Sequence, residues 1–281
     1  MMKKKVAKHT IAYFVIAALL LLIPMYVVSF AREKEEKTQV DILFLGDSLI
    51  GQYRDETSVP YLVGQALGKT AFNGAFGGST MTWYTNDESD YYQRYGLNFP
   101  ALVRAITTSD FSSQRALNVN ESGTEDFESV IGDLQNIDYD KLDMILLEYG
   151  TNDYFAGTKV VGGEGDYFSF EASFREGIER LQECLPACRI IIVGPTFCWN
   201  YSTEMNCEEV SYGGAYLSDY VDMLETLSDV YQIEFIDLYD LYDHSFNIYQ
   251  SNRYTEDGIH PNVYGRQLIV DEIVEYLEAN P

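Results

Sequence analysis

Two kinds of hydrophobic pattern alternate along this chain, short continuous apolar runs and longer segments with a helical period. The first run extends from Asp41 to Leu49 and contains Ile, Leu and Phe until it meets a small polar corner that holds one serine. A continuous run of this kind, bounded by glycine, is typical of a strand buried on both faces of a parallel sheet. Further strands are expected at residues 71–73, 143–148, 189–193 and 234–237.

Between these runs, apolar residues recur every three to four positions, as in helices that bury one face. One such set lies between Phe170 and Leu185, and another between Leu217 and Tyr231. A last helix is expected to open at Pro261, which is a favourable first-turn residue. Strands that alternate with helices predict an α/β fold, in which a parallel sheet is covered on both sides. Right-handed crossovers then bring the loops that follow the strands to one edge.

The N-terminus has a different pattern. Four lysines precede an uncharged segment from Thr10 to Ala31 that is rich in Leu, Ile, Val and Ala. A bilayer-spanning helix needs roughly 20 apolar residues, whereas the apolar core of a cleavable signal is about 7 to 15 residues long. We therefore expect residues 1–31 to be a basic cytoplasmic leader and a single transmembrane anchor in the cell membrane, with the rest of the chain outside the cytoplasm. Cleavage near Ala31 is the alternative and would give a secreted protein.

Length and charge characterise the part of the chain that follows residue 31. Residues 32–38 are expected to be a short stalk, and residues 39–281 are long enough for one α/β domain with a full core. The whole chain has a net charge of −25, and the first 31 residues contribute four positive charges, so the remainder carries −29. This charge excludes nucleic acid as a partner and argues against docking on anionic lipid, so contact with the membrane is expected through the N-terminal helix only. The pattern leaves the oligomeric state undefined.

The chain has four cysteines, which fall into two close pairs. Outside the cytoplasm, an even number of cysteines permits local disulfides. We expect Cys184 to pair with Cys188 and Cys198 with Cys207; four buried thiols are the alternative. A zinc site is not expected, because the chain has three histidines and no Cys-x-x-Cys.

Small and polar residues follow the predicted strands and precede the last helix. The segments are Gly46-Asp47-Ser48-Leu49, Asn73-Gly74-Ala75-Phe76-Gly77-Gly78-Ser79-Thr80, Gly150-Thr151-Asn152-Asp153 and Asp257-Gly258-Ile259-His260-Pro261. In these segments the chain resembles the SGNH (GDSL) hydrolases, a family of esterases and lipases. The resemblance covers Val40 to Leu277. It implies a flavodoxin-like, three-layer α/β/α fold with a five-stranded parallel sheet in the order 2-1-3-4-5.

The same resemblance implies an active site. Ser48 would be the nucleophile, and Asp257 and His260 would complete a catalytic triad. The oxyanion hole would consist of the N–H of Ser48, the N–H of Gly78 and the side-chain amide of Asn152. Neither a metal nor a cofactor belongs to this site.

The residue types suit this chemistry independently of the family. A serine hydroxyl is a weak nucleophile at neutral pH and needs an adjacent base, and imidazole has a suitable pKa. His260 is the expected base because Asp257, three residues earlier, can fix its tautomer. A glycine N–H and an asparagine amide are suitable donors to an oxyanion, with Gly77 as the alternative to Gly78. Two neighbouring acids are expected to make loop hydrogen bonds instead of taking part in catalysis: Asp47 and Asp153.

Aromatic residues near the same edge are candidates for substrate binding. The long region 81–141 begins with Trp83 and is rich in tyrosine, and Trp199 lies in the loop after the fourth strand. Most of these rings are expected to pack in a small core, and Trp83 and Trp199 are the candidates for stacking on a sugar. No long apolar lid is evident, which argues against long-chain triglyceride.

The expected function is that of a serine esterase. It would hydrolyse small acyl esters, such as O-acetyl groups on extracellular or cell-wall carbohydrate, through an acyl-enzyme. The alternatives are a lysophospholipase or thioesterase of the same fold and a carbohydrate O-acyltransferase. A non-catalytic glycan-binding protein is a weaker alternative, because both a nucleophile and a base are present.

Overall fold

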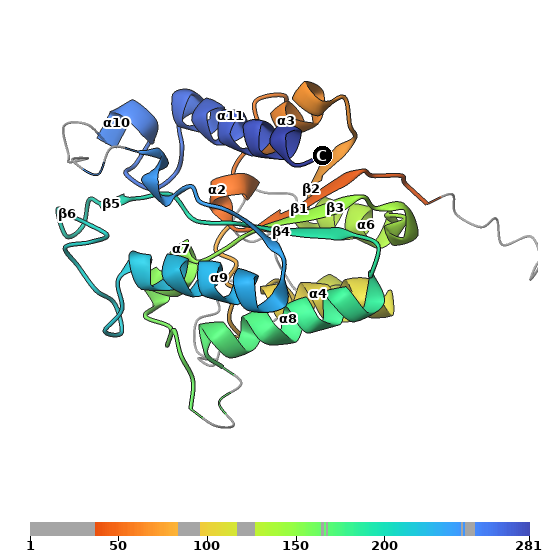
Figure 1. Ribbon diagram of the computed structural model, residues 1–281, viewed down its shortest axis with the longest axis horizontal. Helices are drawn as coiled ribbons and strands as arrows, with labels where there is room; N and C mark the ends of the chain where they lie inside the picture. The colour runs from red at the N-terminus through yellow and green to blue at the C-terminus, as the bar shows by residue number, and fades with distance from the viewer. Residues whose placement is uncertain are drawn as a thin grey trace, which may run out of the picture. The chain divides into compact units, whose positions relative to one another are not determined.

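A computed structural model describes residues 37–83, 96–116, 127–163, 166, 168–242, 244 and 251–281 (Figure 1). The predicted strands form one parallel sheet of five strands, in the order β2-β1-β3-β4-β7. Its strands are β1 (Ile42–Gly46), β2 (Ala71–Asn73), β3 (Met144–Glu148), β4 (Arg189–Val193) and β7 (Glu234–Ile236). The order agrees with the predicted α/β fold.

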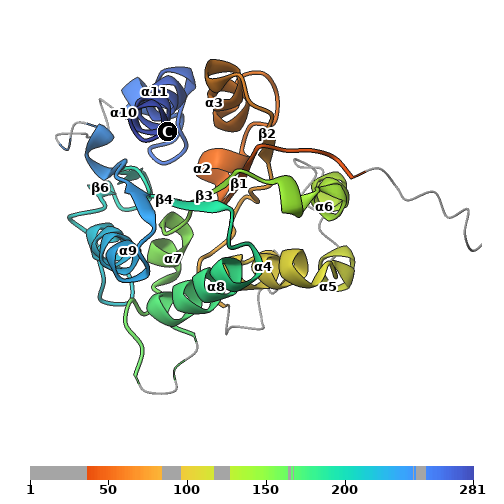
Figure 2. The ribbon, with the colours of Figure 1, turned by 45° about the vertical axis from the view of Figure 1, so that its right-hand side comes forward.

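Helices cover both faces of this sheet and complete three layers (Figures 1 and 2). One face packs against α3 (Val59–Leu67) and α11 (Val263–Ala279). The other face packs against α4 (Phe99–Thr108), α8 (Phe170–Cys184) and α9 (Leu217–Tyr231). The helices predicted from the periodic segments are therefore present and lie on the sheet.

Residues along each strand alternate between the two cores. In β1, Ile42 and Phe44 pack with residues of α3 and α11, whereas Leu43 and Leu45 belong to the core on the other face. All four side chains are buried. Because water reaches neither face of the strand, the run contains no polar position.

The remaining elements complete the unit. α6 (Phe127–Asn136) is as long as α4. The shorter helices are α2 (Ser48–Gly51), α5 (Ser112–Arg115), α7 (Thr151–Ala156) and α10 (Ser251–Tyr254), and the 3₁₀ turns are η3 (Tyr139–Lys141) and η4 (Tyr239–Leu241). An antiparallel hairpin of β5 (Trp199–Asn200) and β6 (Met205–Asn206) follows β4. The sequence analysis predicted neither this hairpin nor the helices between residues 81 and 141.

The last helix begins at Val263, two residues later than predicted. Asn262 is its N-cap, and its side-chain oxygen accepts the N–H groups of Tyr264 and Gly265, both at 3.0 Å. Asparagine is among the most favourable N-cap residues. Pro261 therefore remains in the preceding loop.

The predicted membrane anchor, residues 10–31, lies outside the described residues, as does the stalk up to residue 36. Among the residues that the structure describes, no helix combines the length and apolar character needed to span a bilayer. Residues Thr38–Pro281 form one compact unit. It begins beside α6, where the Thr38 N–H donates to the Asn136 carbonyl at 2.8 Å.

The two predicted disulfides are absent, and all four cysteines are free. Cys184 is exposed at the end of α8, whereas Cys188 is half-buried and its thiol contacts the Arg189 carbonyl at 3.5 Å. Cys198 and Cys207 are buried neighbours, and the Cys198 N–H contacts the Cys207 sulfur at 3.4 Å. The first pair is separated because one side chain faces solvent and the other the core. The second pair packs as two small apolar side chains.

Candidate active site

Ser48 lies at the corner where β1 passes into α2. The preceding residue, Asp47, caps this helix, and its Oδ1 accepts the N–H of Leu49 at 2.9 Å. Asp47 and Leu49 are buried, whereas Ser48 is half-buried. The turn therefore presents the serine side chain at the carboxyl end of a central strand, which is the usual ligand-binding edge of an open parallel sheet.

The Ser48 hydroxyl meets the ring of His260, with 2.8 Å between Oγ and Nε2. On the other side of the ring, Nδ1 lies 2.6 Å from Oδ2 of Asp257. A proton on Nδ1, held by the carboxylate, leaves Nε2 as an acceptor for the serine proton. The structure thus brings together the three residues predicted for the triad.

Asp257 also holds the loop that carries the histidine. Its Oδ1 accepts the backbone N–H groups of Ile259 at 3.0 Å and of His260 at 2.8 Å. One carboxylate oxygen therefore fixes the backbone while the other orients the ring. This division explains why an aspartate three residues before the histidine suits both tasks.

Gly258, inside the same loop, contacts the β5–β6 hairpin. Its carbonyl accepts the N–H of Trp199 at 2.7 Å. Its φ is 89°, and a Cβ at this position would lie 2.2 Å from the Trp199 carbonyl oxygen. Both the conformation and the close approach require glycine. The hairpin therefore supports the His260 loop from one side.

Two of the predicted oxyanion residues, Gly78 and Asn152, lie in segments that hydrogen bonds join to each other and to β1. Of the two adjacent glycines, Gly78 has the left-handed backbone, with φ 74°. The Phe76 N–H of the same loop donates to the Gly46 carbonyl at 2.9 Å. Asn152, in the first turn of α7, donates from Nδ2 to the Ser79 carbonyl at 3.0 Å. Gly78 and Asn152 are therefore held by the same loop.

Asp153 strengthens the connection between α7 and the loop that contains Gly78. Its buried carboxylate accepts the N–H groups of Met81 at 2.8 Å and of Thr82 at 3.1 Å. Burial raises the pKa of Asp153 to about 7, against the lowering effect of these hydrogen bonds. As predicted, Asp153 makes loop hydrogen bonds.

The charges of the histidine and its aspartate are coupled. Burial lowers the pKa of His260, but the hydrogen bond and the negative charge of Asp257 outweigh it and leave the pKa above its usual value. Burial also raises the pKa of Asp257, but hydrogen bonds from the ring and backbone of His260 prevail and bring the pKa to about 2. Asp257 is therefore ionised at neutral pH and can stabilise an imidazolium.

The two tryptophans predicted to bind substrate make other contacts in the structure. The Trp83 indole N–H donates to Glu176 at 2.8 Å, and the Arg104 guanidinium lies 4.7 Å from the Trp83 ring. Trp199 is only 7% exposed. The Trp199 ring packs within the fold, whereas Trp83 is half-buried and lines a groove of about 340 Å³ together with Arg104. Contact between either ring and a substrate stays a prediction.

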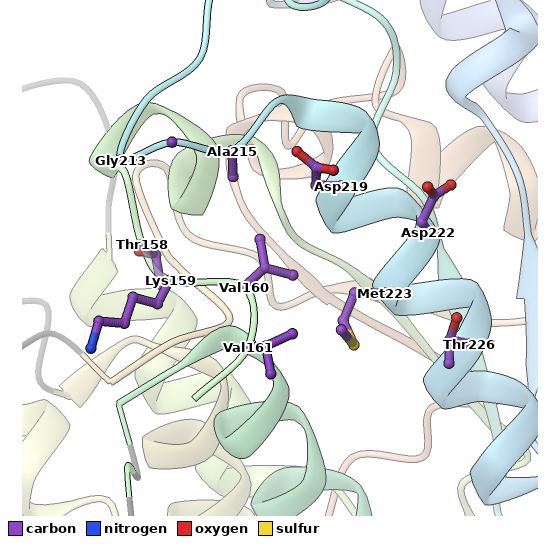
Figure 3. A pocket seen from close by; sticks show the side chains of 11 residues that line it. Thr158, Lys159, Val160, Val161, Gly213, Ala215, Asp219, Asp222, Met223 and Thr226 are labelled. Atoms are coloured by element: carbon purple, nitrogen blue, oxygen red, sulfur yellow. The ribbon is translucent and has the colours of Figure 1, made fainter. Parts of the chain in front are cut away.

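A groove of about 500 Å³ lies elsewhere, between residues 158–161 and α9 (Figure 3). Val160 and Val161 point toward Met223 across it, and Asp219 and Asp222 project from α9 at its rim. None of the predicted site residues lines this groove. In the described ranges of the chain, no group of three His, Cys, Asp or Glu side chains is arranged to hold a metal ion.

Comparison with known proteins identifies similar sequences and folds. The family model for GDSL-like lipases and acylhydrolases matches residues 42–273. No curated protein matches the chain in sequence.

Several solved structures share the fold. A protein from Lactobacillus plantarum is 17% identical, with a TM-score of 0.61 over 87% of this chain and 99% of that chain. A possible lipase from Chitinophaga pinensis is 15% identical, with a TM-score of 0.56 over 85% of this chain and 98% of that chain. Est24, a carbohydrate acetylesterase from Sinorhizobium meliloti, is 17% identical, with a TM-score of 0.53 over 86% of this chain and 99% of that chain. At these identities the likeness concerns the fold.

Proposed function

The chain belongs to the family of GDSL-like lipases and acylhydrolases, and from this premise we propose that it is a serine esterase that acts through an acyl-enzyme. One observation carries the proposal. Two hydrogen bonds connect Asp257 through His260 to the Ser48 hydroxyl, at 2.6 Å and 2.8 Å. A nucleophile, a base and a group that orients the base within such distances are the recognised signature of nucleophilic catalysis.

In the proposed reaction, Nε2 of His260 takes the proton of Ser48 as the serine oxygen attacks the ester carbonyl carbon. The tetrahedral intermediate carries its negative charge on the former carbonyl oxygen. The N–H groups of Ser48 and Gly78 and the amide of Asn152 donate to that oxygen. His260 then gives its proton to the leaving alcohol. Water attacks the acyl-enzyme in the same manner, and the acid is released.

The proposed substrates are small acyl esters, in particular O-acetyl groups on extracellular or cell-wall carbohydrate. The N-terminal segment supports this choice, since an anchor at residues 10–31 would place the site outside the cytoplasm, where glycans are abundant. The fold shared with the carbohydrate acetylesterase Est24 is also consistent with it. No metal or cofactor takes part in the proposed scheme.

The role of Ser48 is tested by Ser48→Ala in the full-length chain. We expect the hydrolysis of p-nitrophenyl acetate to fall by more than about 10³-fold, because the nucleophile of a triad is lost. Labelling by a fluorophosphonate should disappear as well. Ser113→Ala, which changes an exposed serine of α5, serves as the matched control and should keep the wild-type rate. Wild-type turnover in Ser48→Ala would refute the proposal.

The substrate class is tested with natural esters. Acetate release from acetylated xylan and from acetylated peptidoglycan is compared with fatty-acid release from lysophospholipid and from an acyl thioester. Faster acetate release from the glycans supports the proposal. Faster cleavage of the lipid or the thioester would contradict it, as would transfer of acetyl to an added sugar in preference to water.

A further inference from the structure

Two acidic side chains are buried next to each other beside the turn that carries Ser48. Asp47 is 0% exposed, and Glu148, the last residue of β3, is 2% exposed. Glu148 is paired with Gly46 in the β1–β3 register, and the Asp47 N–H donates to the Glu148 carbonyl at 3.2 Å. The two carboxyl groups lie close enough to shift each other's pKa. The end of β3 therefore lies beside the turn that carries the nucleophile.

The described residues do not supply enough donors for these two acids. Oδ1 of Asp47 accepts the Leu49 N–H at 2.9 Å, and the nearby Asn152 N–H also lowers the pKa of Asp47. Oδ2 of Asp47 and both carboxyl oxygens of Glu148 are buried, and no described donor meets them in normal hydrogen-bond geometry; the nearby Asp47 N–H lowers the pKa of Glu148 only in part. Two ionised carboxylates in contact would repel one another as well. A single proton between the two groups removes both difficulties, because it supplies a donor and cancels one charge.

We propose that Glu148 remains protonated in the working enzyme and donates its O–H to Oδ2 of Asp47, so that the pair positions the Ser48 turn and the Asn152 helix for catalysis. This inference rests on the proposed esterase function. Asp47 is the centre of the arrangement, because its carboxylate accepts the backbone N–H of Leu49 and lies near that of Asn152. Glu148 acts through Asp47 and is therefore a positioning residue.

The electrostatic surroundings favour a protonated Glu148. Burial and the negative charge of Asp47 raise its pKa well above the usual value. Burial also raises the pKa of Asp47, to about 6, against the Leu49 hydrogen bond and the charge of His260. Tyr149 and Asp153 also lie within electrostatic reach of the pair, and Tyr149 stays neutral because its pKa is raised well above its usual value. At neutral pH the pair then carries about one negative charge.

Loss of the shared proton has a consequence for the chemistry. A second negative charge beside the Ser48 turn would repel the negative charge that develops on the substrate oxygen. It would also break the hydrogen bond that holds Asp47. We therefore expect kcat to fall at high pH as Glu148 ionises, in addition to the fall at low pH when His260 takes a proton.

Two substitutions of Glu148 test this proposal. Glu148→Leu removes the donor, and kcat for p-nitrophenyl acetate should fall by about tenfold or more at pH 7. Glu148→Gln restores a donor to Asp47 and should recover most of that loss. Because an amide has no proton to lose in this range, Glu148→Gln should also abolish the alkaline decline of kcat. Gln114→Leu, which removes an equally buried polar side chain of α5, should leave the pH profile unchanged.

An infrared measurement tests the protonation without requiring activity. Asp153 is also buried and partly protonated at pH 7, so the measurement is made with Asp153→Asn present throughout. In that background the protein with Glu148 should show the C=O stretch of a buried carboxylic acid at pH 7, and the band should be missing once Glu148→Gln is added. A missing band in Asp153→Asn would overturn the proposal, as would the same loss of kcat in Glu148→Gln and Glu148→Leu. A band without any esterase activity would support the shared proton and refute the proposed function.

Discussion

At the scale of single residues, the Asn152 amide has two N–H bonds, and the structure uses one of them for the Ser79 carbonyl at 3.0 Å. The second is available for a substrate oxyanion. Asn152→Ala should therefore lower kcat by about 10² to 10³, with a much smaller change in KM, because the donor acts mainly in the transition state. Steady-state kinetics with p-nitrophenyl acetate provide the measurement.

Asn280→Ala is a matched control for Asn152→Ala. The Asn280 amide also donates to a backbone carbonyl, that of Tyr276 at 2.9 Å, but it lies at the end of α11. Its loss should leave kcat unchanged. If Asn152→Ala raised KM and kept kcat, the residue would bind substrate in the ground state, and its place in the oxyanion hole would be refuted.

Asp257 and His260, which the structure brings together with Ser48, could be selected from the sequence because they combine a rare residue type with a local spacing. Asp257 and His260 are three residues apart, and the chain contains only three histidines. Glu148 could not be found in the same way. In the sequence it only ends an apolar run, and its contact with Asp47 depends on the pairing of β3 with β1, more than 90 residues apart along the chain.

At the scale of elements, the β5–β6 hairpin and the His260 loop should behave as one unit. Gly258→Ala introduces a Cβ that would lie 2.2 Å from the Trp199 carbonyl oxygen, in a backbone conformation that alanine rarely adopts. The loop must then move away from the hairpin, and His260 with it. We expect kcat/KM to fall by about tenfold or more, because a shift of about 1 Å at a catalytic group can cost a factor of 100.

Gly214→Ala separates backbone strain from the steric clash. Gly214 has φ 91°, close to the 89° of Gly258, but an added Cβ would meet nothing within 4 Å. Gly214→Ala should lose thermal stability from strain alone, Gly258→Ala should lose more because the clash adds to the strain, and only Gly258→Ala should lose activity strongly. Equal activity in both variants would show that the hairpin does not position His260.

Elements could be predicted where their pattern was long and regular. α8 and α9 each show a sustained helical period, and the sheet strands are continuous apolar runs. The hairpin could not be recognised, since β5 and β6 have two residues each. The expectation of a disulfide between Cys198 and Cys207 identified two neighbours correctly but not their chemical state.

At the scale of the whole molecule, the alternation of strands and helices predicted a parallel sheet with helices on both sides, and the structure confirms it. The strand order came only from the family resemblance. Alternation constrains the handedness of each crossover but does not decide whether the next strand is added to the left or the right of the sheet. That choice depends on contacts between distant helices, such as those of α3 with α11, which no local pattern contains.

The buried acids predict how the stability of the whole molecule depends on pH. Burial raises the pKa of Asp47 to about 6 and that of Asp153 to about 7, so the folded protein binds these protons more tightly than the unfolded chain does. Their contribution to stability is complete below pH 4, the usual range of an aspartate, and is lost as the pH rises through 6 and 7. The raised pKa of His260 acts in the same direction. The lowered pKa of Asp257, about 2, has the opposite effect, but only in strongly acidic solution.

Stability and activity should therefore respond oppositely to mild acidification. Between pH 8 and pH 5 the free energy of unfolding should rise, by about 1.5 kcal/mol for Asp47 and about 2.5 kcal/mol for Asp153, while kcat/KM falls because His260 takes a proton. Urea unfolding and steady-state kinetics across the same buffers provide both measurements. Asp153→Asn removes one of the titrating groups, so it should reduce the slope of stability against pH while the acid limb of kcat/KM keeps its midpoint. A urea midpoint that increases from pH 5 to pH 8 would mean that the buried acids are ionised in the folded protein, and the shared proton of Asp47 and Glu148 would lose its support.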